Sequence, residues 1–331
     1  MSMRWYVVRR ILWAILATYL ILSAAFFIFA YTPDPNKTLT KFAAGYQAAL
    51  AGENVTQAQE EAVAAFIQAR NYDEPILDRY IKWIVDYSTL DWGRTLSGKP
   101  VIDVIANKTP VTLAYLIPAI LLALLGGVAI GLYSATHQHS LLDYLGTTVA
   151  YFGIGIPHFF LAEALLIIAV QQFNWYAVEI DPRYGLWTPR NIQVFILPTL
   201  VLAVNLLAVQ ARYVRAESLE YMPADFVKTL RASGASTWDV ARHILRNASI
   251  PLVSLFFTEV LAVLFVTIYV IEVVFGIPGL GSLAFSAIKQ RDIGLILATT
   301  FLPVLVGVFG NLIQDILYTI LDPQIGYGEE E

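Results

Sequence analysis

Long apolar runs alternate with polar segments along the chain, and the length of these runs predicts membrane-spanning helices. A helix needs about 20 mostly apolar residues to cross a hydrocarbon core ~30 Å thick. Six runs come close to or exceed this length, at residues 11–31, 111–133, 145–170, 192–209, 252–275 and 293–320. We therefore predict an all-α polytopic membrane protein with six transmembrane helices.

The composition agrees with this class and excludes several kinds of chemistry. Of the 331 residues, 57% are hydrophobic and 14% are charged, against roughly 25% charged residues in soluble domains. The chain has no cysteine, which excludes disulfides, thiolate metal sites and cysteine catalysis. No grouping of serine, histidine and acids indicates hydrolysis. We therefore predict no catalytic, cofactor-binding or metal-ligating residue, and the net charge of -5 does not indicate nucleic-acid binding.

The distribution of basic residues predicts which side of the membrane each loop faces. Arg4, Arg9 and Arg10 precede the first span. The segment between the fourth and fifth spans contains Arg212, Arg215, Lys228, Arg231, Arg242 and Arg246. The short loops on the opposite side contain fewer, namely Arg183, Arg190, Lys289 and Arg291. Because cytoplasmic loops are enriched in Lys and Arg, we predict a multi-pass protein of the cytoplasmic membrane with both termini in the cytoplasm.

The long external loop, residues 32–108, is predicted to be mostly helical. Residues 56–70 have a helical composition. Within residues 72–92, apolar and aromatic side chains recur at the spacing of one helix face, at Ile76, Tyr80, Trp83, Ile84 and Tyr87. We predict a cap that packs on the spans, and contact with an external partner is the alternative.

Residues 93–100, GRTLSGKP, match the phosphate-loop pattern up to its final position. That position needs Ser or Thr to hold Mg²⁺, and Pro100 occupies it here. No strand is predicted before it, and the segment lies outside the cell in the predicted orientation. We therefore predict a glycine-rich turn that leads into the second span, and no ATP site.

Two acidic residues, Glu163 and Glu259, fall within predicted spans. Acids inside a membrane are costly, and they commonly mark substrate or ion pathways. Each of these side chains could line a pore, or it could form a hydrogen bond between helices.

Residues 212–251 form a basic insert between two spans. Pro223 and Asp225 suit the first turn of a helix, and Gly234 ends that helix. Its apolar stripe consists of Phe226, Val227 and Leu230, beside Lys228 and Arg231.

The second helix of the insert begins with a capping box formed by Ser236 and Asp239. It places Trp238, Ala241, Ile244 and Leu245 on one side, opposite Arg242 and Arg246, and Pro251 opens the next span. We predict two short amphipathic helices, joined at a glycine, that lie in a partner's groove. A loop that faces lipid headgroups is the alternative.

The insert resembles the EAA loop of ABC-transporter permeases, in particular the dipeptide/oligopeptide/nickel family. The resemblance lies in residues 228–234, KTLRASG, and 242–248, RHILRNA. It continues through residues 272–281, EVVFGIPGLG, and ends near Asp322 and Pro323. The chain departs from the family pattern at Lys228-Thr229-Leu230 in place of Glu-Ala-Ala, at the bulky residues 263–266 and at Gln324, and its external loop is longer than usual.

This resemblance implies a type I importer permease fold. The transmembrane domain would cover residues 109–321, with the coupling loop at about 212–250. Residues 1–31, 32–108 and 322–331 would form the N-terminus with the first span, the external loop and a cytoplasmic tail. The residues expected to contact an ATPase are Phe226, Lys228, Leu230, Arg231, Gly234, Ser236, Asp239, Arg242 and Arg246. Those expected in an external gate or turn are Glu272, Pro278, Gly279, Gly281, Arg291 and Asp292.

The resemblance also implies a function and a set of partners. The chain would form half of the pore of an ATP-driven importer for di- or oligopeptides. Its partners would be a second homologous permease subunit, two cytoplasmic ATPases, an external substrate-binding protein and membrane lipid, with no nucleic acid. The chain itself would bind no cofactor and would not be an enzyme, because ATP and Mg²⁺ belong to the ATPases. Import of oligosaccharide or nickel is the alternative within this machinery, and a secondary transporter or an anchoring subunit is an alternative outside it.

Overall fold

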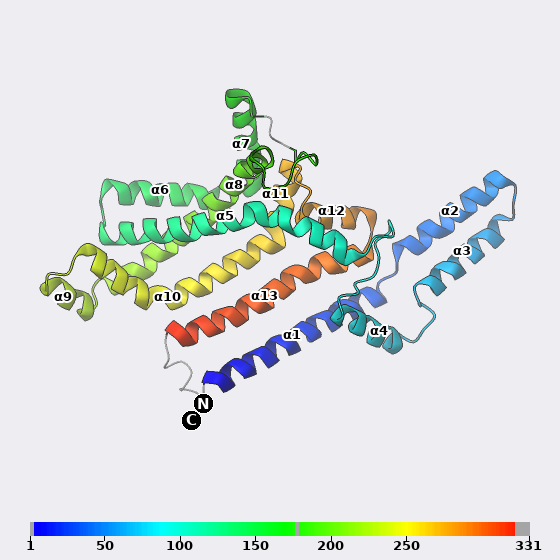
Figure 1. Cartoon of the computed structure of the whole chain (residues 1–331), viewed down its shortest axis with the longest axis horizontal. Coiled ribbons are helices and arrows are strands. Elements are labelled where there is room, and N and C mark those ends of the chain that lie inside the picture. Colours follow the sequence, from blue (N-terminus) through cyan, green and yellow to red (C-terminus); the bar gives the residue numbers. More distant parts are fainter. Residues whose placement is uncertain (1–2, 176–178, 322–331) are drawn as a thin grey trace. The chain divides into compact units, whose positions relative to one another are not determined.

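A computed structural model describes residues 3–175 and 179–321, and within these ranges the regular elements are all helical. In chain order they are α1 (Met3–Tyr31), α2 (Pro35–Ala51), α3 (Val55–Ala69), α4 (Ile76–Ser88), α5 (Val101–Thr136), α6 (Leu141–Gly155), α7 (His158–Phe173), α8 (Pro189–Tyr221), α9 (Asp225–Ala232), α10 (Thr237–Ala262), the π-helical turn η1 (Val263–Thr267), α11 (Ile268–Phe275), α12 (Leu280–Gln290) and α13 (Ile293–Leu321) (Figure 1). The predicted tail, residues 322–331 with Asp322, Pro323 and Gln324, lies outside the described residues, and so does the side chain of Arg4.

Five helical segments of the described chain are long and apolar enough to cross a membrane, and a bent pair, α6 and α7, adds a sixth if it is counted as one span. The predicted span over 145–170 is not one continuous helix, because the axes of α6 and α7 differ by 105°. Pro157 provides the physical reason. It lacks an N–H donor and disfavours helical backbone at the preceding residue, and Ile156 is extended, with φ -88° and ψ 120°.

The fourth and fifth spans are longer than predicted and take up most of the basic insert. α8 runs from Pro189 to Tyr221, so residues 212–221 continue the fourth span. α10 starts at Thr237 and passes through Pro251 without ending. The second helix of the insert is therefore the first part of a span and not a short separate helix, which corrects the prediction. Between these two spans lies the short helix α9, with 8 residues.

The described residues form two compact units. The first comprises Met1–Ala14, Ile105–Phe285 and Leu302–Glu331, and the second comprises Ile15–Val104 and Ser286–Phe301. In the first unit α8 contacts α6, α7, α10 and α11. Its largest apolar core gathers buried side chains from α5, α8 and α11, including Tyr115, Leu202 and Ile271.

Two glycines allow α5 to approach α8 closely. A Cβ atom at Gly131 would lie 2.7 Å from the carbonyl oxygen of Ala211 and 2.6 Å from the Cβ of Val214. A Cβ at Gly127 would lie 3.2 Å from the backbone nitrogen of Ala211. Helices in membranes often meet at small residues four positions apart, because these let the two backbones come together.

We expect Gly131→Leu to lower the thermal stability of the detergent-solubilised protein, because α5 must move away from the backbone of α8. Overpacking of this kind typically costs about 1–3 kcal/mol. Gly155→Leu is the matched control, since a Cβ atom at Gly155 would have no heavy atom of another residue within 4 Å, apart from its chain neighbours. Equal melting temperatures of the two variants would contradict the close-packing role.

The second unit contains the helical segments α2, α3 and α4 and part of α1. The predicted helix over 56–70 is confirmed as α3. The predicted inward face of α4 is also confirmed: the rings of Tyr80 and Trp83 lie 5.5 Å and 5.1 Å from the ring of Phe26 on α1. The hydroxyl groups of Tyr80 and Ser23 are 2.7 Å apart. The α4 segment therefore packs on the first span, as predicted for a cap.

Residues 93–100 form a turn that leads into α5, as predicted. Arg94 and Pro100 make an isolated antiparallel bridge, and the N–H of Thr95 donates to the carbonyl of Lys99 at 2.9 Å. The N–H of Leu96 donates to a carboxylate oxygen of Asp292 at 2.7 Å. The backbone amide of Leu96 therefore binds a side chain of the same chain.

The loop between α7 and α8 is organised by Asn191 and Asp181. Asn191 is fully buried, and its amide donates to the carbonyl groups of Asp181, Tyr184 and Gly185. The carboxylate of Asp181 accepts hydrogen bonds from the guanidinium of Arg183 at 2.9 Å and 2.7 Å. These bonds hold the pKa of Asp181 well below its ordinary value.

The lowered pKa predicts how this loop responds to acid. A carboxylate whose pKa is lower in the folded state stabilises that state above its unfolded pKa, about 3.9 for Asp. The stabilisation is lost as pH falls from there through the folded pKa. We therefore expect the excess melting temperature of the wild type over Asp181→Asn to stay constant from about pH 7 to pH 5 and to shrink below about pH 4. Loss of the excess between pH 7 and pH 5 would contradict this account.

Candidate functional site

Helix α9 is held to the start of α10 by a small apolar core. Val227, Val240 and Ile244 are buried together. Phe226 and Leu230, both predicted to contact an ATPase, pack against this cluster. Their apolar surface therefore serves first to fix the position of α9 within this chain.

The joint between the two helices has the local structure that the sequence predicted. Gly234 has φ +79°, a conformation that favours glycine. The N–H of Ala235 donates to the carbonyl of Leu230 at 3.0 Å, and that of Gly234 donates to the carbonyl of Arg231 at 3.1 Å. These two bonds make a Schellman motif, which satisfies carbonyl groups at the end of a helix.

The capping box at the start of α10 is likewise confirmed. The N–H of Asp239 donates to the hydroxyl of Ser236 at 3.2 Å, and the N–H of Ser236 donates to the carboxylate of Asp239 at 3.0 Å. Both predicted coupling residues thus hold the helix start, which fixes the direction in which α10 leaves the joint.

The face of this helix pair that points away from its core is basic. Lys228, Arg231, Arg242 and Arg246 are all exposed, and Lys228 pairs with Asp225 at 2.8 Å. We call this face, together with Gly234 and Trp238, the coupling surface.

Trp238 lies on the coupling surface and not on the packed side, so that part of the prediction is wrong. It is 73% exposed. Val240, Ala241 and Ile244 form the buried face, and at ~100° per residue position 238 lies roughly a third of a turn away from its centre. Tryptophan and arginine are both enriched among the residues that contribute most to binding in protein interfaces.

Glu272, in the predicted external turn, is fully buried and connects three helices of the first unit. One carboxylate oxygen accepts hydrogen bonds from the hydroxyl groups of Thr112, at 2.6 Å, and Tyr115, at 2.8 Å. The other accepts from the N–H of Ser282 at 2.8 Å. The hydroxyl of Thr112 also accepts from the N–H of Leu280 at 2.8 Å. The start of α12 is therefore bound to α5 and α11.

Two positions of this turn require glycine because other atoms of the chain lie very close to the backbone there. A Cβ at Gly279 would lie 2.2 Å from the carboxylate of Glu272, and a Cβ at Gly281 would lie 2.6 Å from the carbonyl oxygen of Ile268. Pro278 is exposed, and its ring restricts the backbone immediately before Gly279. These predicted residues shape a turn around one buried carboxylate. The partners Thr112 and Tyr115 were not identified from the sequence.

Arg291 and Asp292 belong to the second unit. Arg291 has φ +55°, and its carbonyl accepts the side-chain amide of Asn36 at 2.9 Å. Asp292 caps the start of α13 by accepting the N–H of Leu295 at 3.2 Å, in addition to its bond with Leu96. Within this unit both residues hold loops in place.

The two acids predicted to line a pore differ in exposure. Glu163 on α7 is exposed, and Glu259 on α10 is half-buried. Neither side chain hydrogen-bonds to another residue in the described ranges, so the interhelix hydrogen bond is not observed there. A pore-lining role stays a prediction for both.

Comparison with known families bears on the region that contains α9 and the Glu272 turn. The model of the family described as "Binding-protein-dependent transport system inner membrane component" matches residues 127–327. The chain belongs to this family. The predicted resemblance and the all-helical type I permease fold are thereby confirmed, and the chain is a multi-pass membrane component of a transport system.

Individual relatives align over most of the chain. It is 30% identical to the oligopeptide transport system permease protein AppB of Bacillus subtilis (strain 168), over 97% of this chain and 99% of that protein. It is 31% identical to the dipeptide transport system permease protein DppB of the same organism, over 82% and 87%. It is 32% identical to the glutathione transport system permease protein GsiC of Salmonella paratyphi A, over 97% and 99%. The similarity to two of these relatives thus includes the segment between the first two spans, residues 32–108.

Proposed function

We propose that this chain is one of two permease subunits of an ATP-driven importer of peptides. The observation that carries the proposal is the position of α9. This short helix joins two long spans, α8 and α10 (Figure 1). Together with the start of α10 it presents the exposed basic coupling surface. An ATPase in the cytoplasm is the partner proposed for that surface.

The connection between α9 and the spans explains how motion would be transmitted. α8 has 33 residues and α10 has 26, and both run without a break from the region of α9 into the apolar part of the chain. The core of Val227, Val240 and Ile244 ties α9 to α10. Closure of two ATPases on ATP would move α9, and the helices would transmit that movement. For closure to alternate the access of the pore, the ATPases must contact the two states differently.

Peptides are the proposed cargo, because the three relatives compared above transport an oligopeptide, a dipeptide and glutathione according to their names. An external binding protein would deliver the peptide, in keeping with the description of the family. A second homologous permease subunit and two ATPases would complete the complex, and both termini of this chain would lie in the cytoplasm.

The proposal is tested by purification of the complex from its own membranes and by reconstitution. We expect the tagged chain to co-purify with an ATPase that contains a phosphate loop and with a second six-span subunit. We expect vesicles with this complex and its binding protein to take up labelled peptide only when ATP is present. Uptake without ATP would favour a secondary transporter, and uptake of oligosaccharide or nickel in place of peptide would reject the cargo.

A further inference from the structure

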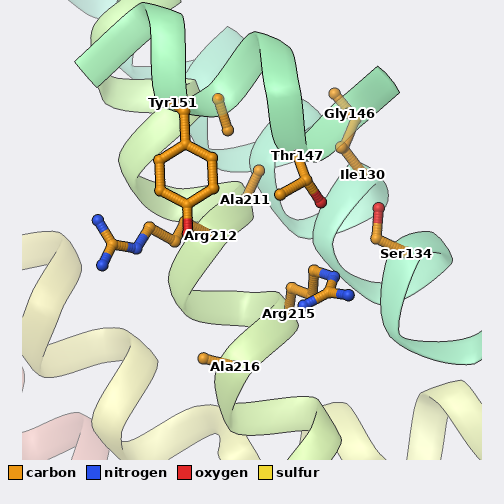
Figure 2. Close-up of a pocket in the computed structure, with 10 residues that line it drawn as sticks. Ile130, Ser134, Gly146, Thr147, Tyr151, Ala211, Arg212, Arg215 and Ala216 are labelled. Atoms are coloured by element: carbon orange, nitrogen blue, oxygen red, sulfur yellow. The ribbon is translucent and has the colours of Figure 1, made fainter. Parts of the chain in front are cut away.

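A small cleft lies between α5, α6 and α8, apart from both regions described above. Its volume is about 150 Å³. The residues that line it include Ile130, Ser134, Thr147, Tyr151, Arg212 and Arg215. In Figure 2 the hydroxyl groups of Ser134 and Thr147 lie on the same side as the guanidinium of Arg215, and Tyr151 and Arg212 lie on the other side.

One arginine of the cleft is held in place by a buried acid. The guanidinium of Arg215 pairs with both carboxylate oxygens of Asp143, at 2.8 Å and 3.1 Å. The Asp143 side chain is 2% exposed and also accepts the N–H of His139. The charge of Arg215 is therefore balanced within the chain, and its position is fixed at the wall of the cleft.

The second arginine has no such acid. Arg212 lies 5.5 Å from the ring centroid of Tyr151, and no carboxylate pairs with it among residues 3–175 and 179–321. Ser134 is 2% exposed, and its hydroxyl lines the cleft without a hydrogen bond to any residue in those ranges. The cleft thus has one unbalanced positive charge and a serine hydroxyl that faces it without a partner in the chain, and both groups suit an anion.

We propose that this cleft binds the phosphate group of an anionic phospholipid. Guanidinium groups match phosphate oxygens in geometry and charge, and basic pockets between membrane helices on the cytoplasmic side bind anionic headgroups. The neighbouring face of α6 exposes Leu145, Val149 and Phe152, by 51%, 62% and 66%. These side chains, one to two turns apart, would contact acyl chains, which favours a lipid over a soluble phosphate. The assignment of the site to the cytoplasmic leaflet rests on the orientation proposed above, whereas lipid binding itself does not.

Native mass spectrometry of the full-length chain in detergent tests the site, with phosphatidylglycerol and phosphatidylcholine added at equal concentrations. We expect preferential binding of phosphatidylglycerol, and a loss of about fivefold in its affinity in Arg212→Gln, as expected for one basic side chain near the headgroup. Ser134→Ala should weaken binding to a smaller extent. The control is Arg94→Gln, which removes an exposed arginine that does not line the cleft and should leave the affinity unchanged.

Two results would overturn the proposal. One is equal binding of both lipids, and the other is equal affinity of the two arginine variants for phosphatidylglycerol. A third arm uses glycerol phosphate: if it binds the wild type as tightly as the lipid does, the ligand is a soluble phosphate and the lipid assignment is wrong. Because Arg212 is exposed, its substitution should leave the melting temperature unchanged, and Ser134→Ala provides a second test of the same site. Failure of this proposal would leave peptide transport untouched, since no step of transport uses the cleft.

Discussion

Replacement of Glu272 by alanine is expected to destabilise the folded protein more than any other single truncation considered above. The change would remove the acceptor of the Thr112 and Tyr115 hydroxyl groups and of the Ser282 N–H. Each buried donor left without a partner costs about 1–3 kcal/mol. We therefore expect a loss on the order of 3 kcal/mol or more, measured as a lower melting temperature of the detergent-solubilised chain.

A conservative variant separates the hydrogen bonds from side-chain volume. Glu272→Gln keeps the size and one acceptor oxygen, so it can still accept from Thr112 and Tyr115. Its amide nitrogen would then face the N–H of Ser282, which places two donors together. We expect an intermediate loss of stability for this variant.

Glu259→Ala is the matched control for Glu272→Ala. Glu259 is a half-buried acid in the same long helical segment, Thr237–Phe275. It makes no hydrogen bond to a described residue, so its removal leaves no such donor without a partner. A melting temperature as low in Glu259→Ala as in Glu272→Ala would refute the role given to the buried network.

Replacement of Gly234 by valine is expected to reduce transport at least about tenfold while the chain still inserts and folds. With φ at +79°, the position suits glycine, and a side chain with a Cβ costs about 1–2 kcal/mol there. Relief of that strain would open the Schellman motif and displace α9 from its place on α10. About 1.4 kcal/mol of lost docking energy corresponds to tenfold weaker binding. We therefore expect at least about tenfold less ATPase bound, and peptide uptake reduced accordingly.

Two further variants control for backbone strain. Gly234→Asn should retain most transport, because asparagine tolerates positive φ better than valine does. Gly52→Val introduces comparable strain at φ +71°, at the end of α2 in the second unit, and should leave ATPase binding intact. Wild-type uptake by Gly234→Val would show that α9 is not the coupling element.

The features predicted correctly from the sequence are those decided by neighbouring residues. Apolar runs of sufficient length predicted the spans, because the thickness of the hydrocarbon core sets that length. Ser236 and Asp239 stand three positions apart, so their reciprocal bonds require only the first turn of a helix. Gly234 ends α9 because its own backbone, with φ at +79°, leaves the helical conformation, and this too is a local property. The bend could also have been predicted from Pro157. The apolar run continues on both sides of this proline, however, and was therefore interpreted as one span.

Contacts between segments that are distant in the sequence were not predicted, because tertiary packing determines them. Glu272 binds the hydroxyl of Thr112, 160 positions earlier, and nothing near either residue in the chain indicates the pair. The close contact of Gly131 with Ala211 and the pairing of Arg215 with Asp143 likewise join distant segments. Caps, turns and span lengths depend on interactions within a few residues, so the linear order of residues is sufficient for them. Buried polar networks and helix contacts depend on which segments meet in space, and only the folded structure determines that.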